Sequence, residues 1–253
     1  MSFGWASRVG AIVVLLGTAH PVAAGGDREE VFARQRAVLV DEILARHIES
    51  EAVLEAMRSV ERHRFVPDGV IDRAYDNAPL PIGHGQTISQ PYIVARMSEL
   101  LAVESGDRVL EVGTGSGYQA AVLAAMGVAV WSIEIVEEVA KQGAENLRAN
   151  GFDVHLRVGD GYLGWPEAAP FDGIIVTCAP DHVPSPLQEQ LAEGGRLVIP
   201  VGELGDQELV VIEKSGGELV RRAIIPVRFV PMTGPHSRDD DRRAPSGTEF
   251  DLN

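Results

Sequence analysis

A glycine-rich turn that follows a short, mostly apolar run is the feature that most constrains this chain. Residues 109–118 read VLEVGTGSGY, and an alanine-rich stretch follows up to residue 126. Glycines at a strand-to-helix turn let a bound molecule approach the backbone closely, because no Cβ stands in the way. We therefore expect a buried parallel strand, a ligand-binding turn and a helix, in that order.

The spacing of these glycines indicates which ligand the turn binds. A dinucleotide-binding turn has the pattern GxGxxG, but here Gly113, Gly115 and Gly117 alternate, and Tyr118 stands where the last glycine of that pattern would fall. A strand, a glutamate and three alternating glycines are typical of the turn that binds S-adenosylmethionine (AdoMet) in Rossmann-like methyltransferases. The spacing therefore favours AdoMet as the cofactor and disfavours a nicotinamide-dependent oxidoreductase.

Apolar runs and helical patterns alternate along the rest of the chain. The sequence predicts helices at 117–126, 136–149 and 184–193, and strands at 107–112, 129–134, 153–158, 172–177 and 195–201. Two later apolar runs, 208–213 and 218–230, flank a Ser-Gly-Gly turn and predict a hairpin. The expected fold class is therefore α/β, a Rossmann-like AdoMet-dependent methyltransferase fold whose doubly wound, mostly parallel sheet gains antiparallel edge strands late in the chain.

A helical extension precedes this alternating region. Apolar residues recur at helical spacing between residues 27 and 63, and Ser50 is placed to cap the second of two helices. The segment 64–90 is rich in proline and glycine and predicts irregular structure, while Pro91 is a favourable first residue for a helix to about Leu101. We expect a helical extension with a substrate-side loop over 27–90, and an AdoMet-binding core over 91–236.

Both ends of the chain are expected to lie outside this fold. Arg8 precedes an apolar run at 9–19, and small residues follow at 22–24, which is the pattern of a secretory signal over residues 1–26. The alternative is a mis-assigned start, with folding that begins near residue 27. The run is too short to span a bilayer, so we expect no stable membrane association. The acidic and arginine-containing tail, 237–253, has little to bury and is expected to be disordered.

Composition limits the classes of partner and of chemistry. The chain has 22 Lys and Arg against 37 Asp and Glu, a net charge of -15, which disfavours nonspecific binding of nucleic acid. The single cysteine, Cys178, excludes an internal disulfide, and its place after an apolar strand favours a small core residue over a nucleophile. His84, His155 and His182 do not have the spacing of metal ligands, so no metal is expected.

Three polar residues are candidates for a role in binding or catalysis. Glu134 ends the second strand of the alternating region, where an acid can accept hydrogen bonds from both ribose hydroxyls of an adenosine group, although a solvated loop residue is the alternative. Asp160, between two glycines, is placed either to meet an adenine amino group or to form an Asp-Gly turn. Ser89 is either part of an active site or the cap of the helix that begins at Pro91.

Several linked stretches carry a resemblance to a known family. They are RFVP at 64–67, LPIG at 80–83, GQTISQP at 85–91, EVGTGSGY at 111–118, GDG at 159–161, PFD at 170–172 with IIVT at 174–177, and RFVP at 228–231. With these stretches the sequence resembles the protein-L-isoaspartate (D-aspartate) O-methyltransferases from about residue 27 to residue 233. Many methyltransferases share the glycine turn, whereas the TISQP segment is far more specific to this family.

The resemblance implies roles for particular residues. It places the active-site serine at Ser89 and implies that Thr233 closes over the cofactor. The other residues implied to bind AdoMet are Pro91 and Val94 at a helix start, Glu111, Gly113, Gly115 and Ser116 at the glycine turn, Glu134 at the ribose, and Asp160 with Gly161 beside the adenine.

The resemblance also implies an activity and a set of partners. Members of the family transfer a methyl group to the free carboxylate of an L-isoaspartyl or D-aspartyl residue, and the ester then cyclises to a succinimide, which starts repair. The implied partners are damaged proteins and peptides, and we expect a monomer. The family and the supply of AdoMet imply the cytoplasm, whereas the apparent signal implies export.

The chemistry agrees with the absence of an obvious catalytic base. A carboxylate has a pKa of about 4, so it is already a nucleophile at neutral pH. Alignment with the methyl carbon is then the main task, and positioning can lower a barrier by roughly 7–11 kcal/mol. Two alternatives remain open, namely a related methyltransferase that acts on a small molecule or RNA, and an AdoMet-binding protein without catalysis. The TCAP sequence at 177–180, in place of an Asp-Pro-Pro-Tyr-type motif, disfavours methylation of base amino groups.

Overall fold

The structure, a computed structural model, describes the backbone of residues 24–238 and the side chains of residues 28–236. The expected signal segment lies outside these residues except at its end, because the first helix already begins at Ala24. Most of the expected disordered tail also lies outside them. Within residues 24–238, none of the helices combines the length and the apolar character that a membrane span requires.

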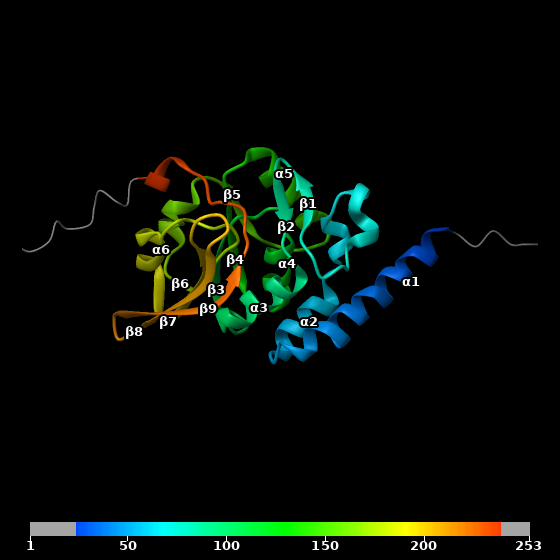
Figure 1. The fold of residues 1–253 in the computed structure, drawn as a ribbon, viewed down its shortest axis with the longest axis horizontal. Helices are drawn as coiled ribbons and strands as arrows, with labels where there is room; N and C mark the ends of the chain where they lie inside the picture. The colour runs from blue at the N-terminus through cyan, green and yellow to red at the C-terminus, as the bar shows by residue number, and fades with distance from the viewer. Residues whose placement is uncertain (1–23, 239–253) are drawn as a thin grey trace, which may run out of the picture.

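A seven-stranded sheet forms the centre of the molecule (Figure 1). Its strands follow the order β5-β4-β3-β6-β7-β8-β9. They are β3 (Arg108–Val112), β4 (Ala129–Glu134), β5 (His155–Val158), β6 (Phe171–Val176), β7 (Leu191–Val201), β8 (Gln207–Ser215) and β9 (Glu218–Val227). The first five pair in parallel and the last two add antiparallel pairs, so the predicted mostly parallel sheet with late antiparallel strands is confirmed.

Helices cover both faces of the parallel part of the sheet. They are α3 (Pro91–Leu101), α4 (Tyr118–Ala125), α5 (Glu137–Ala149) and the short α6 (Ser185–Glu189). The interior of β3, β4 and β6 is buried almost completely, with Leu110 and Ile174 at 0 % exposure. Strands that are buried on both faces read as nearly continuous apolar runs, which is why the sequence predicted this part of the sheet closely.

The predicted helix at 184–193 is too long. α6 ends at Glu189, and the chain enters β7 at Leu191, where it pairs with Phe171 of β6. Leu191 and Phe171 are both buried. Tertiary packing therefore stabilises Leu191 as the first residue of β7 and not as part of the helix. Only the short 3₁₀ turns η5 (Gly161–Leu163) and η6 (Pro166–Ala168) stand between β5 and β6.

The segment 64–90 is more regular than the sequence suggested. It contains the 3₁₀ helices η3 (Arg62–Phe65) and η4 (Asp68–Arg73), and then an antiparallel hairpin of β1 (Leu80–Gly83) and β2 (Gln86–Ile88). The prediction of irregular structure was therefore wrong for the hairpin, because strands this short show no clear alternation. The hairpin leads directly into α3 and fixes the position of Ser89 between the two.

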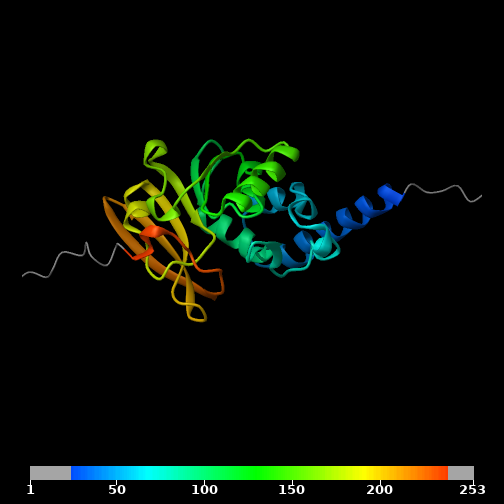
Figure 2. The same cartoon turned by 90° about the horizontal axis from the view of Figure 1, so that it is seen from above.

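Two further helical stretches pack at one end of the molecule, opposite the late strands (Figure 2). α1 (Ala24–Ala37) continues through a π-helical turn, η1 (Val38–Ile43), and a 3₁₀ turn, η2 (Leu44–Arg46), before α2 (Glu51–Ser59) begins. The predicted cap is confirmed, because the Ser50 hydroxyl accepts a hydrogen bond from the Val53 amide at 3.4 Å.

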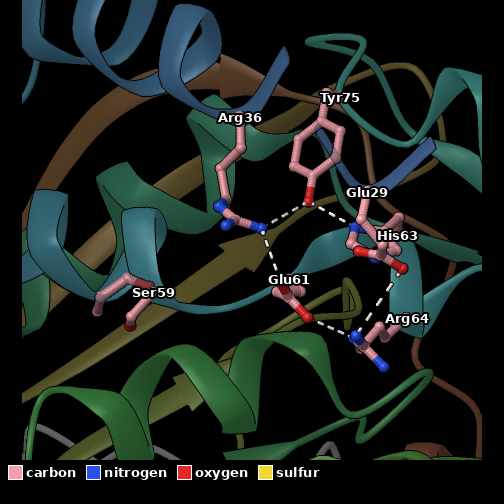
Figure 3. Close-up of polar contacts among 8 residues, drawn as sticks. Glu29, Arg36, Ser59, Glu61, His63, Arg64 and Tyr75 are labelled. Carbon is pink, nitrogen blue, oxygen red and sulfur yellow. Dashed lines mark hydrogen bonds and ion pairs between the residues drawn. The ribbon is translucent and has the colours of Figure 1, made fainter. Parts of the chain in front are cut away.

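A polar network attaches α1 to the body of the protein (Figure 3). Arg36 of α1 donates to the Tyr75 hydroxyl at 3.2 Å and to Glu61 at 3.4 Å. The Tyr75 hydroxyl lies 2.8 Å from His63 Nδ1, and the His63 ring stacks on Phe32 with centroids 4.3 Å apart. The network therefore combines a buried aromatic contact with paired charges.

The same network brings together three side chains of types that bind metals. Ligand atoms of Glu29, Glu61 and His63 lie within 4.8 Å of one another. Arg64 forms ion pairs with both carboxylates, and Arg36 pairs with Glu61 as well. Because two guanidinium groups already neutralise these carboxylates, we assign the cluster to the docking of α1 and not to a cation.

Candidate active site

The glycine turn lies at the carboxyl ends of the parallel strands, where ligands of open α/β sheets bind. Gly113 follows β3 with a φ of +99°, and its amide donates to the Ile133 carbonyl of β4 at 2.8 Å. The Thr177 hydroxyl, just past β6, donates to the carbonyl oxygens of Gly113 and Val112 at 2.7 and 3.1 Å. The turn is therefore held from the strands on both of its sides.

Glu134 lies beside the turn and helps to shape it. One carboxylate oxygen accepts the Gly115 amide at 3.0 Å, and the other accepts the amides of Ile135 and Val136 at 3.0 and 3.1 Å. Each carboxylate oxygen has about two lone-pair sites, so the oxygen that faces Gly115 keeps capacity for a further donor. Glu134 also lines the cavity described next.

A cavity opens over the turn. Its walls come from the ends of β3, β4, β5 and β6, from the β1–β2 hairpin and from residues after β9. They are Gln86, Thr87, Val112, Gly113, Gly115, Ile133, Glu134, Ile135, Gly159, Gly161, Thr177, Cys178, Val230, Pro231, Met232 and Thr233. Glu134 is the one charged side chain among these lining residues, so the cavity is suited to a cationic ligand that also carries hydroxyl groups.

Ser89 lines two further spaces that adjoin each other near the turn. A small cavity brings Ser89 together with Val94, Ser116 and the glycine turn. A wider groove extends from Ser89 along the residues that follow β9, up to Val230. Two side chains, Thr87 and Thr177, line both of these spaces and the main cavity as well. Ser89 therefore lies where the groove meets the space around the turn.

The alternative role of Ser89 as a helix cap does not hold. The N-cap of α3 is Gln90, and the Tyr92 amide in the first turn of that helix donates to Asn77 Oδ1 at 3.0 Å and not to Ser89. Pro91 occupies the first helical position, as the sequence predicted. Ser89 is partly exposed and lines the two spaces, and its hydroxyl has no protein hydrogen-bond partner among the described residues.

Three of the predicted cofactor-binding residues do not line these cavities. Pro91 is buried in the first turn of α3. Glu111 is completely buried beneath the glycine turn, where it bonds to Ser132. The Asp160 carboxylate accepts hydrogen bonds from the Tyr162 amide and from both the amide and the ring of His236.

Asp160 acts on the chain segment that forms the far wall of the cavity. The segment after β9 runs beside residue 179, with the Met232 amide donating to the Ala179 carbonyl at 2.7 Å. The contact of Asp160 with His236, at 2.8 Å, holds the end of this segment. Thr233 lies between these two attachments and lines the cavity, and the role that the resemblance implies for it, closing over the cofactor, stays a prediction.

Sequence reasoning missed several lining residues. Thr87 and Thr177 stand within stretches that carry the family resemblance, but no local pattern marks them as part of a site. Cys178 also lines the main cavity, and burial raises the pKa of its thiol above the usual range. A thiol held in its neutral form is a poor nucleophile, which agrees with the expectation that Cys178 has no nucleophilic role.

Comparison with known proteins decides the family. The family model described as protein-L-isoaspartate(D-aspartate) O-methyltransferase (PCMT) matches residues 33–237. The chain belongs to this family. The matched range contains the β1–β2 hairpin, the glycine turn and the segment that carries Thr233, so it includes every wall of the cavity.

Similar PCMT proteins cover almost the whole chain. A protein-L-isoaspartate O-methyltransferase of Opitutus terrae is 54% identical over 225 residues, which are 88% of this chain and 95% of that protein. Protein-L-isoaspartate O-methyltransferase 1 of Nitrosospira multiformis is 50% identical over 242 residues, which are 93% of this chain and 100% of that protein. The predicted resemblance is therefore confirmed, and the chain is an AdoMet-dependent carboxyl methyltransferase of this type.

Solved structures of PCMT proteins confirm the fold. One protein-L-isoaspartate O-methyltransferase matches with a TM-score of 0.73 and 28% identity, over 83% of this chain and 69% of that one. A putative PCMT from Plasmodium falciparum, solved in complex with S-adenosyl-L-homocysteine, matches with a TM-score of 0.69 and 27% identity over 78% of this chain and 98% of that one. That complex supports AdoMet as the cofactor of the family.

Proposed function

We propose that this chain transfers the methyl group of AdoMet to the free carboxylate of L-isoaspartyl residues, and of D-aspartyl residues, in damaged proteins and peptides. The observation that carries the proposal is the position of Ser89, where the groove that can admit a peptide meets the space around the glycine turn. The methyl donor and its acceptor must meet at such a junction.

The residues of the main cavity fit AdoMet. A Cβ at Gly113 would lie 2.4 Å from Thr177 Oγ1, and one at Gly161 would lie 2.3 Å from Val112 Cγ1, so the walls close tightly around bare backbone at both positions. Within the part of the chain that the structure describes, no Lys or Arg lines the cavity to meet a phosphate, and the carboxylate of Glu134 suits a ribose diol and a positive charge. These features favour a sulfonium cofactor over a dinucleotide.

We assign the predicted binding residues to parts of the cofactor by their place in the cavity. Gly113 and Gly115 hold the methionine part, Glu134 accepts from the ribose hydroxyls, and Gly161 lies beside the adenine. Val94 and Ser116 line the small cavity near Ser89, and they contact the cofactor on the side from which the acceptor approaches. Pro91, Glu111 and Asp160 do not contact the cofactor directly and support the residues that do.

The protein's own task is to orient the acceptor. Bound AdoMet supplies a methyl group on a positively charged sulfur, which is a good leaving group. The Ser89 hydroxyl donates a hydrogen bond to one carboxylate oxygen of the substrate and leaves the other oxygen free to attack. Because that carboxylate is ionised at neutral pH, no side chain has to remove a proton. The glycine turn and Thr177 fix the position of the methyl donor. The rate enhancement therefore comes from alignment of the donor with the acceptor.

The groove, the small cavity and the main cavity are all lined within residues 79–233 of the same molecule. We propose that the enzyme works as a monomer. Light scattering coupled to size-exclusion chromatography, run with the activity assay at the same protein concentration, tests this point, and activity confined to a larger species would contradict it.

Methyl transfer to a matched pair of peptides tests the function. The two peptides share one sequence and differ only in an L-isoaspartyl or an L-aspartyl residue, and radiolabelled AdoMet reports the transfer. We expect labelling of the isoaspartyl peptide and at least tenfold less of its partner. Equal labelling of both peptides would favour a methyltransferase with another substrate. Binding of AdoMet without labelling of any peptide would favour a non-catalytic protein.

A further inference from the structure

A completely buried carboxyl group lies beneath the glycine turn and has no part in the steps described above. Glu111 is the fourth residue of β3, between Ser132 of β4 and Ile175 of β6. Its exposure is 0 %. One carboxyl oxygen lies 2.5 Å from the Ser132 hydroxyl, and the other has no hydrogen-bond partner among the described residues.

A chain of hydroxyl groups connects this carboxyl group to the turn. Ser132 Oγ lies 2.6 Å from Thr114 Oγ1 as well as 2.5 Å from Glu111. Thr114 stands between Gly113 and Gly115, and it lines the small cavity in which Ser89 lies. Glu111, Ser132 and Thr114 are all buried, so water does not compete for their hydrogen bonds.

The surroundings of Glu111 disfavour a negative charge. Burial raises the pKa of its carboxyl group to about 8, and the nearby carboxylate of Glu134 adds to the rise. The hydrogen bond with Ser132 acts in the opposite direction, as does the nearby backbone N–H of Ala120 in α4, which makes no hydrogen bond of ordinary geometry with Glu111, and both effects are weaker than burial. Among the described residues, no positively charged side chain lowers the pKa of Glu111. An ionised carboxyl group here would keep one oxygen buried without a donor, which is costly.

We propose that Glu111 is a positioning residue that works as an uncharged carboxylic acid and sets the direction of the hydrogen bonds from Ser132 to Thr114. The acid donates to Ser132, and Ser132 then donates to Thr114. The Thr114 hydroxyl is left with its own proton free to donate into the small cavity, toward an anionic group of the bound ligand. This inference rests on the proposed AdoMet site but not on the identity of the methyl acceptor.

Loss of the proton would reverse this order. An ionised Glu111 can only accept, so Ser132 would donate to Glu111 and Thr114 would donate to Ser132. Thr114 would then present a lone pair to the cavity in place of a proton, and an anionic group of the ligand would be repelled. The affinity for the cofactor should therefore fall as the pH rises through the pKa of Glu111.

Calorimetric titration of S-adenosylhomocysteine between pH 6.5 and 9.5 tests the proposal with the full chain. For the wild type we expect about tenfold weaker binding at pH 9 than at pH 7, because only the protonated fraction binds well. Glu111→Gln keeps an uncharged donor toward Ser132. We expect this variant to bind within about threefold of the wild type at pH 7 and to lose most of the decline above pH 8. The decline that remains in the variant measures the titration of the ligand's own amino group.

Glu134→Gln is the matched control, because the other acid of the site is expected to act as a carboxylate. It should bind at least tenfold more weakly than the wild type at every pH tested. A loss of more than tenfold in Glu111→Gln at pH 7, with an unchanged melting temperature, would overturn the proposal, as would identical pH profiles for Glu111→Gln and the wild type. If methyl transfer to isoaspartyl peptide is absent while these profiles hold, the proposed function fails and the role of Glu111 stands.

Discussion

The hydroxyl oxygen of Thr177 lies 2.7 Å from the carbonyl oxygen of Gly113. This hydrogen bond ties the end of β6 to the first glycine of the turn. Since Thr177 also lines all three spaces at the site, one side chain both fixes the loop under the cofactor and forms the wall toward the peptide groove. The predictions that follow test this arrangement and the elements that support it.

Gly113→Ala should disrupt the turn. The new Cβ would lie 2.4 Å from Thr177 Oγ1, and the residue would keep a φ of +99°. Thr177 must then rotate and give up its hydrogen bonds, so we expect at least tenfold weaker binding of S-adenosylhomocysteine in calorimetry. Gly106→Ala is the matched control, because Gly106 has a φ of +98° and open space around its Cβ position. It should lose only about 1–2 kcal/mol of stability and keep its affinity, and an equal loss of affinity in both variants would contradict this account.

Ser89→Ala should slow methyl transfer without weakening the cofactor. A hydrogen bond to a charged group contributes about 1.5–3 kcal/mol, so kcat should fall about 10–100-fold while the affinity for S-adenosylhomocysteine changes less than twofold. Ser89→Thr keeps the hydroxyl and should recover part of the rate. A main effect on cofactor affinity, with kcat preserved, would show that Ser89 supports the cavity and does not orient the acceptor.

His63 should make the protein sensitive to acid. Burial lowers the pKa of His63 below its usual 6.5, against the opposing effect of Glu29 and Glu61, while Arg36 and Arg64 lower it further. The folded state then binds fewer protons than the unfolded chain below pH 6.5, so stability falls as the pH drops through that value. The melting temperature of the wild type should fall further between pH 7.5 and 5.5 than that of His63→Gln, which cannot titrate. If the melting temperatures of the two proteins fell equally between pH 7.5 and 5.5, the proposed role of His63 would be wrong.

Arg62 should be essential to the attachment of the segment that precedes the hairpin. It is completely buried, donates to the carbonyls of Ala74 and Ala78 at 2.8 and 3.4 Å, and lies 5.0 Å from the centre of the Tyr118 ring. Burial lowers its pKa to about 10, so it stays charged at neutral pH.

Arg62→Met leaves these carbonyls without their donor, and we expect a loss of at least about 2 kcal/mol in urea unfolding. Arg73→Met provides the comparison, because Arg73 pairs with Asp76 at the surface. It should cost less than about 1 kcal/mol. Similar losses in the two variants would mean that the buried guanidinium does not hold the segment.

The sequence predicted the sheet well because burial on both faces leaves an apolar pattern that is read locally. The glycine turn was equally clear, since its spacing is itself the requirement for close approach to a ligand. The β1–β2 hairpin was missed because strands of four and three residues carry too little pattern. The length of α6 was misjudged because the pairing of Leu191 with Phe171 is a tertiary effect.

Part of the candidate site was predictable because its residues belong to a local sequence pattern. Glu134 and the turn follow each other within the alternating pattern, and both line the main cavity. Asp160 was predicted either to meet the adenine or to form an Asp-Gly turn. Its carboxylate also contacts His236, and no local signal connects residues 76 positions apart. Thr87 and Thr177 meet only because the hairpin and β6 converge in space. The burial of Glu111 under the turn could not be read from its motif.

A crystal structure of this chain with S-adenosylhomocysteine tests the central claim most directly. The account predicts that the ligand occupies the cavity over the glycine turn, with its ribose at Glu134 and its sulfur facing the junction where Ser89 lies. The methyl group of AdoMet would then point into the groove between Ser89 and Thr177. A ligand bound away from the turn, or a sulfur facing away from Ser89 with the groove closed off, would contradict it.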